Sequence, residues 1–171
     1  MHAKVASGPG PEKRGDVFNS RVGFGGVNVF EKTYWIADKA YNLKPYKNLD
    51  ELLSTIIKIY EKSSKKDCLK IFNSHPELAV EKKLTKESKK EQNDANLNQC
   101  NDKEFSEFKN LNILYRKKFG FPFIIAVKGK SKNEILINFR QRIKNEIHLE
   151  FEEAKKQVKK IADFRLKEIT N

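Results

Sequence analysis

The spacing of apolar residues is the feature that most constrains the fold of this chain. From about residue 35 to residue 169, apolar side chains recur every three or four positions, and the alternation of a half-buried strand is almost absent. In residues 48–62, NLDELLSTIIKIYEK, Leu52, Ile56 and Tyr60 follow Asn48, a candidate N-cap. Such spacing places apolar side chains on one face of a helix. The sequence therefore predicts an all-α bundle of about seven helices in a single compact domain.

One apolar run is too short for a buried helix. The heptapeptide FPFIIAV, residues 121–127, has a proline at its second position and follows Gly120, a residue suited to end a helix. We expect it to pass through the core as extended or irregular chain. Further helix starts are predicted at Thr85 and at Ser131, where Glu134 completes the spacing of a capping box.

Length and composition place the chain among single-domain globular proteins. Residues 1–15 are rich in glycine and proline and are expected to be a flexible arm or an expression remnant, which leaves residues 16–171 as the helical domain. No run of about 18 apolar residues predicts a membrane span, and no secretory signal is visible. Cys68 and Cys100 have neither metal-site spacing nor a disulfide framework. Since the C-terminus also lacks a peroxisomal address, a cytoplasmic location is expected.

The net charge of +12 raises the question of a nucleic-acid partner. Only six of the 35 basic residues are arginines, which nucleic-acid readers favour for bidentate contacts. The lysines are interleaved with glutamates along the predicted helices. We interpret most of them as a solvated surface that would steer a small anionic substrate, and we expect no nucleic-acid partner. A basic helical binding module for nucleic acid or a partner enzyme is the alternative function.

The first polar feature is His75, in the stretch FNSHPELAVEKKL at residues 72–84. A residue before proline is pushed toward extended backbone, and Pro76 suits the first turn of a new element. His75 is therefore presented at a fixed break between two elements. It is either an ordinary connector or an imidazole aimed at a site.

The second polar feature is one face of the helix predicted to start near Thr85. Ser88, Glu91, Gln92 and Ala95 share that face, which presents small and polar groups in one direction. Ser88 and Glu91 also have capping-box spacing, so they are either a cap or, if Thr85 is the cap, free for other contacts.

The third polar feature is Arg165, which stands in the apolar stripe of the last predicted helix, from about His148 to Ile169. A guanidinium buried at such a position needs an anionic partner. The alternatives are an internal salt bridge with Glu91 or another acid, a side chain that reaches the edge of the core, and a clamp for a carboxylate or ureido group.

Several stretches together carry a resemblance to a known family. They are VFEKTYWIADKAY, HPELA, LTKESKKEQNDANL, FGFPFIIAVKG and EEAKKQVKKIADFRLKEI, in this order. Over roughly residues 24–169 the chain resembles the 2-oxo-4-hydroxy-4-carboxy-5-ureidoimidazoline (OHCU) decarboxylase family. The resemblance implies an all-α enzyme of uric acid breakdown, commonly a homodimer, that converts OHCU to (S)-allantoin and carbon dioxide without a cofactor or metal.

The resemblance also implies roles for individual residues. His75 corresponds to the family's key acid, and Glu91 and Arg165 are placed with it in the catalytic group. The implied substrate contacts are Pro76, Ser88, Lys89, Lys90, Gln92, Phe123, Ile124, Ile125, Ala126 and Val127. The chain departs from the family pattern at Val80 and Asn96, where glycine is usual, at TYW in place of SPW, and in a shorter loop before Ser88.

The chemistry of the implied reaction explains why these groups are needed. The substrate's own carbonyl and imine groups accept the electrons left by decarboxylation, so neither pyridoxal phosphate nor a metal is required. The protein adds orientation, desolvation and a proton on one face. His75, with an ordinary pKa of about 6.5, is suited to donate that proton. Glu91 would hold ureido and ring N–H groups with Ser88 and Gln92, and amides of residues 121–127 would bind ring carbonyl oxygens. A preceding hydroxyisourate hydrolase is a possible partner.

Overall fold

The computed structural model describes residues 29–80 and 84–170, and within them it contains seven α-helices, one short 3₁₀-helix and no strand. The elements in chain order are α2 (Trp35–Tyr41), α3 (Leu49–Glu61), α4 (Lys65–Ser74), α5 (Lys86–Asp94), η1 (Leu97–Gln99), α6 (Asp102–Phe119), α7 (Lys132–Arg142) and α8 (Ile147–Thr170). The predicted all-α class is confirmed. The arm predicted at residues 1–15 lies outside the described residues.

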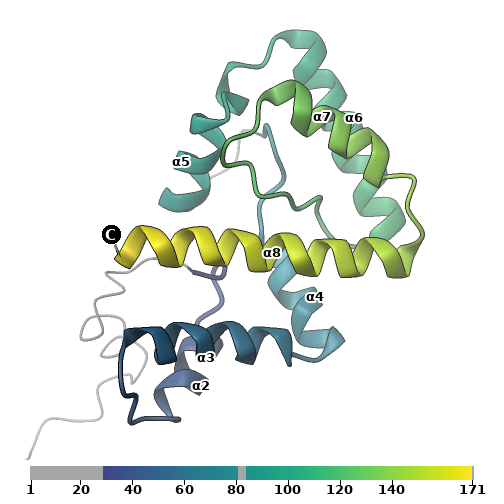
Figure 1. Ribbon diagram of the computed structural model, residues 1–171. Coiled ribbons are helices and arrows are strands. Elements are labelled where there is room, and N and C mark those ends of the chain that lie inside the picture. Colours follow the sequence, from purple (N-terminus) through teal and green to yellow (C-terminus); the bar gives the residue numbers. More distant parts are fainter. Residues whose placement is uncertain (1–28, 81–83, 171) are drawn as a thin grey trace, which may run out of the picture.

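Helix α8 is the long central element of the bundle. Figure 1 shows it crossing the molecule, with α2, α3 and α4 on one side and α5, α6 and α7 on the other. Its predicted stripe is buried at Ala154, Val158, Ile161 and Arg165. The helix thus brings Arg165 to the junction between the two groups of helices. None of the described helices is both long enough and apolar enough to span a bilayer.

The segment at residues 121–127 is non-helical and buried, as predicted. The Phe123 ring stacks on Phe139 of α7, with ring centroids 3.9 Å apart. Arg142 Nη1 donates a 2.8 Å hydrogen bond to the Ile124 carbonyl, while Arg142 Nη2 pairs with Glu150 Oε1 at 2.6 Å. A buried ion pair between α7 and α8 therefore fixes the path of this segment.

The helix ends follow the local signals in the sequence. The side chains of Asn48 and Thr85 accept N-cap hydrogen bonds, and Ser131 with Glu134 forms a complete capping box. Gly120 ends α6 in the left-handed conformation, with φ of 79°. These contacts supply partners for backbone groups that a helix end leaves unsatisfied.

The departure from the family pattern at Asn96 falls on a backbone position with φ of 58°. Glycine is the usual residue in the left-handed region, and asparagine is among the few others that tolerate it. Asn96 therefore preserves the turn between α5 and η1 that the family's glycine would make.

Candidate functional site

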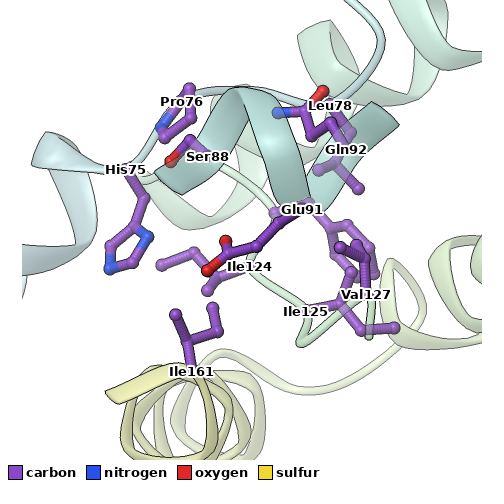
Figure 2. Close-up of a pocket in the computed structure, with 11 residues that line it drawn as sticks. His75, Pro76, Leu78, Ser88, Glu91, Gln92, Ile124, Ile125, Val127 and Ile161 are labelled. Carbon is purple, nitrogen blue, oxygen red and sulfur yellow. The ribbon is translucent and has the colours of Figure 1, made fainter. Parts of the chain in front are cut away.

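A pocket lies where the end of α4, helix α5, the segment at residues 121–127 and α8 meet (Figure 2). Its cavity volume is only about 30 Å³, enough for a water molecule and well below the usual size of a ligand site. The residues that line it are His75, Pro76, Leu78, Ser88, Glu91, Gln92, Phe123, Ile124, Ile125, Val127 and Ile161. The pocket thus brings together most of the residues that the sequence predicted for the site.

His75 is the C-cap of α4, with extended backbone angles that the following proline favours. Its side chain is only 7% exposed, and Nε2 has no hydrogen-bond partner among the described residues. Figure 2 shows the imidazole on the same side of the pocket as the Glu91 carboxylate, close to Ile124 and Ile161. A buried ring nitrogen without a partner is available to a ligand.

The protonation state of His75 differs from the sequence-based expectation. Burial, with a smaller contribution from the positive charge of Arg165, lowers the pKa of His75 from 6.5 to about 3. The expectation of an ordinary pKa is therefore wrong for the free protein, because the sequence did not reveal how completely the ring is buried. Near pH 7 the imidazole is neutral.

Arg165 forms an internal ion pair, one of the alternatives that the sequence left open. Its Nε and Nη2 donate to the two carboxylate oxygens of Glu91 at 2.7 and 3.0 Å, and its Nη1 donates to Glu31 Oε2 at 3.0 Å. Arg165 is 2% exposed. Burial alone would lower its pKa, but the hydrogen bonds and charges of Glu91 and Glu31 outweigh burial and raise the pKa. The guanidinium therefore lies behind Glu91 as its counter-ion.

Glu31 is the residue of this network that sequence reasoning missed. It is 1% exposed and accepts hydrogen bonds from Thr85 Oγ1 at 2.7 Å and from Ser88 Oγ at 2.8 Å, in addition to the one from Arg165. It precedes α2, far from its partners in the sequence, and the only signal was its place in the stretch VFEKTYW. Two carboxylates and one guanidinium give the network a formal charge of −1.

The competition between Thr85 and Ser88 for the cap of α5 is resolved in favour of Thr85. Its Oγ1 accepts from the Ser88 amide at 3.3 Å, so Ser88 and Glu91 are not used as a capping box. The carboxylate of Glu91 instead faces the pocket and Arg165.

Three of the predicted contact residues do not line the pocket. Lys89 and Lys90 are exposed, and Lys90 Nζ lies 3.6 Å from the carboxylate of Glu168. Ala126 is buried outside the lining, and its amide N–H donates to Gln157 Oε1 at 3.0 Å. Consecutive residues of a helix point in different directions, which accounts for the two lysines.

Part of the segment at residues 121–127 lines the pocket, through Phe123, Ile124, Ile125 and Val127. The amide N–H groups of Ile124, Ile125 and Val127 have no hydrogen-bond partner within the described part of the chain. Among the described residues, no lysine or arginine lines the pocket. The described residues also contain no group of three or more His, Cys, Asp or Glu side chains arranged to hold a metal ion. The pocket lining thus includes a neutral imidazole and a carboxylate acceptor, together with a backbone segment that has unpaired amides.

Comparison with known proteins identifies the group to which this arrangement belongs. Residues 27–167 match the sequence profile of OHCU decarboxylase. The chain belongs to the OHCU decarboxylase family. It is 32% identical, over 140 residues, to the 2-oxo-4-hydroxy-4-carboxy-5-ureidoimidazoline decarboxylase of Haloferax volcanii, a match that covers 82% of this chain and 83% of that protein.

Two further relatives place the chain within the family. It is 40% identical over 141 residues to the "Uric acid degradation bifunctional protein" of Bacillus sp. (strain TB-90), covering 82% of this chain but only 28% of that longer protein. A crystal structure of OHCU decarboxylase in the presence of (S)-allantoin matches with a TM-score of 0.70 and 26% identity, covering 84% of this chain and 96% of that one. Both sequence and architecture therefore agree on the family.

Proposed function

We propose that the protein is an OHCU decarboxylase that produces (S)-allantoin and carbon dioxide in urate breakdown, with His75 as the proton donor. The observation that carries the proposal is the buried Nε2 of His75, which has no partner among the described residues and shares a small pocket with Glu91. Family membership supports the same reaction.

Substrate orientation would come from two kinds of contact. We propose that the carboxylate of Glu91, held by Arg165, would accept hydrogen bonds from the ureido and ring N–H groups of OHCU. The amides of Ile124, Ile125 and Val127, which have no partner among the described residues, would donate to ring carbonyl oxygens. Donors and acceptors that are fixed before the substrate arrives need little reorganisation during the reaction.

The leaving carboxylate would enter the part of the pocket whose described lining is apolar. The Ile124 and Ile161 side chains lie beside His75 there. A carboxylate is poorly stabilised next to apolar side chains, whereas the neutral product CO₂ is not. Its negative charge also favours the protonated form of His75, whose pKa is about 3 in the free protein. Substrate binding is therefore expected to bring a proton onto His75.

The chemical step then needs only that proton. The electron pair of the broken carbon–carboxylate bond forms a double bond to the ureido-bearing ring carbon, the imine pair moves onto the ring nitrogen, and CO₂ leaves. The hydroxyl of this planar enol then becomes the carbonyl of allantoin: its proton passes to the ring nitrogen, and the double-bond pair takes up a proton at the ureido-bearing carbon. Nε2 of His75 adds a proton to one face of the planar intermediate, which sets the (S) centre. Spontaneous decay lacks this facial selection, so stereospecific protonation is the gain that the enzyme provides.

The test is circular dichroism of a urate oxidation mixture to which purified protein is added. Wild-type protein should accelerate the decay of fresh OHCU and accumulate (S)-allantoin, whereas His75→Ala should give the spontaneous rate and racemic product. His148→Ala, at an exposed histidine of α8, is the matched control and should behave as wild type. Wild-type rate and stereochemistry in a folded His75→Ala variant would remove His75 from the proposed role.

Assembly as a homodimer is part of the same proposal. Ile113 and Leu114 on α6, and Ile147 and Leu149 at the start of α8, are more than half exposed, and their apolar area supports a contact with a second copy. Light scattering of the purified protein should give twice the mass of one chain. A cytoplasmic location and an association with the preceding hydroxyisourate hydrolase are also proposed, and a pull-down with that hydrolase tests the latter.

A further inference from the structure

The loop that follows His75 holds an unusual backbone conformation. Ala79 has φ of 51°, in the left-handed region that residues with a Cβ rarely adopt. Strained conformations of this kind persist when surrounding contacts determine them, and they concentrate at functional sites. The contacts that hold residues 76–79 in this conformation therefore also affect the position of the neighbouring His75.

Two buried amide side chains, from two different helices, hold this loop. From α5, Gln92 accepts a 3.2 Å hydrogen bond from the Ala79 amide and donates a 3.3 Å hydrogen bond to the Glu77 carbonyl. From α6, Asn112 Nδ2 donates a 3.0 Å hydrogen bond to the Leu78 carbonyl. Three successive loop residues are thus bound through their backbone, immediately after Pro76.

The chemistry of Asn112 indicates why an amide is present there. The side chain is 3% exposed, and its Oδ1 has no hydrogen-bond partner among the described residues. An unsatisfied buried oxygen is costly, so an apolar residue of the same shape would avoid that cost. The benefit of asparagine at this position is its N–H group, which reaches the Leu78 carbonyl.

The side-chain amide of Gln92 also binds the loop backbone. Both polar atoms of its amide are bound to the loop backbone, although the side chain also lines the pocket. In the free protein these two hydrogen bonds hold the loop, and they leave one N–H group of the amide for a ligand in the pocket.

We propose that Gln92 and Asn112 form an amide clamp that positions His75, so that its imidazole protonates one face of the intermediate. The clamp rests on the proposed function, because it acts through His75. Neither amide needs to touch the substrate. They fix the backbone of residues 77–79, and because Pro76 is rigid and bonded to His75, the position of His75 is fixed as well.

The test uses Asn112→Leu, which is nearly isosteric and removes the clamp's N–H group along with the unsatisfied oxygen. The control is Asn110→Leu, an exposed asparagine on the same helix. The measurements are kcat, KM and the enantiomeric composition of allantoin from fresh OHCU, corrected for spontaneous decay. Asn112→Leu should lower kcat about tenfold, leave KM within about twofold, and lose part of the (S) excess. The control should retain wild-type values.

Stereochemistry separates a positioning role from a structural one. A residue that only supports the fold would reduce the amount of folded protein, but the product of the remaining enzyme would stay (S). Gln92→Met is the second variant, acting from the other helix, and it should show the same loss of (S) excess. Fully (S)-specific product and unchanged kcat in either folded variant would overturn the clamp, as would the failure of both variants to fold. Inactive wild-type protein would overturn the proposed function itself.

Discussion

The buried neutral imidazole of His75 gives the protein a specific dependence of stability on pH. The pKa of His75 is about 3 in the folded protein and close to the ordinary value of about 6.5 in the unfolded chain. Between these two values the unfolded chain binds more protons than the folded one. The free energy of unfolding therefore falls as the pH decreases through this range, and the contribution of His75 is fully present only above about pH 6.5.

The magnitude follows from the two pKa values. Each pH unit below about 6.5 costs roughly 1.4 kcal/mol, so His75 alone lowers the free energy of unfolding by about 1.4 kcal/mol between pH 7.5 and 5.5. At pH 4 the loss reaches about 3 kcal/mol by the same relation. Glu91, Glu31 and Arg165 face the same region, but their contributions are common to wild type and to a variant at position 75.

The assay is denaturant unfolding of wild type and His75→Asn at pH 7.5, 6.5 and 5.5. From pH 7.5 to pH 5.5, the free energy of unfolding of wild type should fall by about 1.4 kcal/mol relative to that of His75→Asn. His148→Asn is the matched control, because His148 is exposed on α8, and its difference from wild type should stay constant. A constant difference for His75→Asn as well would show that His75 is solvated, and would refute the account of its burial.

Two further predictions concern groups around the site. Glu31→Gln removes one of the two carboxylates paired with buried Arg165 and should lower the free energy of unfolding by about 3 kcal/mol, whereas Glu107→Gln, which breaks an exposed pair with Arg140, should change it by less than about 1 kcal/mol. Equal effects of the two variants in thermal unfolding would contradict the buried network. Asn96→Ala replaces asparagine, which tolerates the left-handed region, by a residue that does not, and should cost about 1 kcal/mol, while Asn96→Gly should be tolerated. Equal stability of the Ala and Gly variants would show that this turn has relaxed.

Much of the fold could be predicted from sequence because its signals are local. Apolar spacing identified the helices, and the caps at Asn48, Thr85 and Ser131 are contacts between residues three positions apart. The buried path of residues 121–127 followed from an apolar run too short for a helix. Such features need no knowledge of how the elements pack.

The site was predicted less completely, because its details depend on packing. The need of Arg165 for an acid followed from its place in an apolar stripe, and Glu91 was named. Glu31 was missed because its partners Thr85, Ser88 and Arg165 lie far from it in the sequence. The low pKa of His75 depends on burial by several elements. That Lys89 and Lys90 are exposed could have been predicted from helix geometry alone, because both lie off the helix face shared by Ser88, Glu91 and Gln92.

A crystal structure of this protein with bound (S)-allantoin tests the central claim most directly. The account predicts that Nε2 of His75 lies about 3.5 Å from the ring carbon that carries the ureido group, on the face that bears its hydrogen, with Glu91 on the ureido N–H groups. An imidazole turned away from that carbon, or facing its opposite side, would contradict proton delivery by His75.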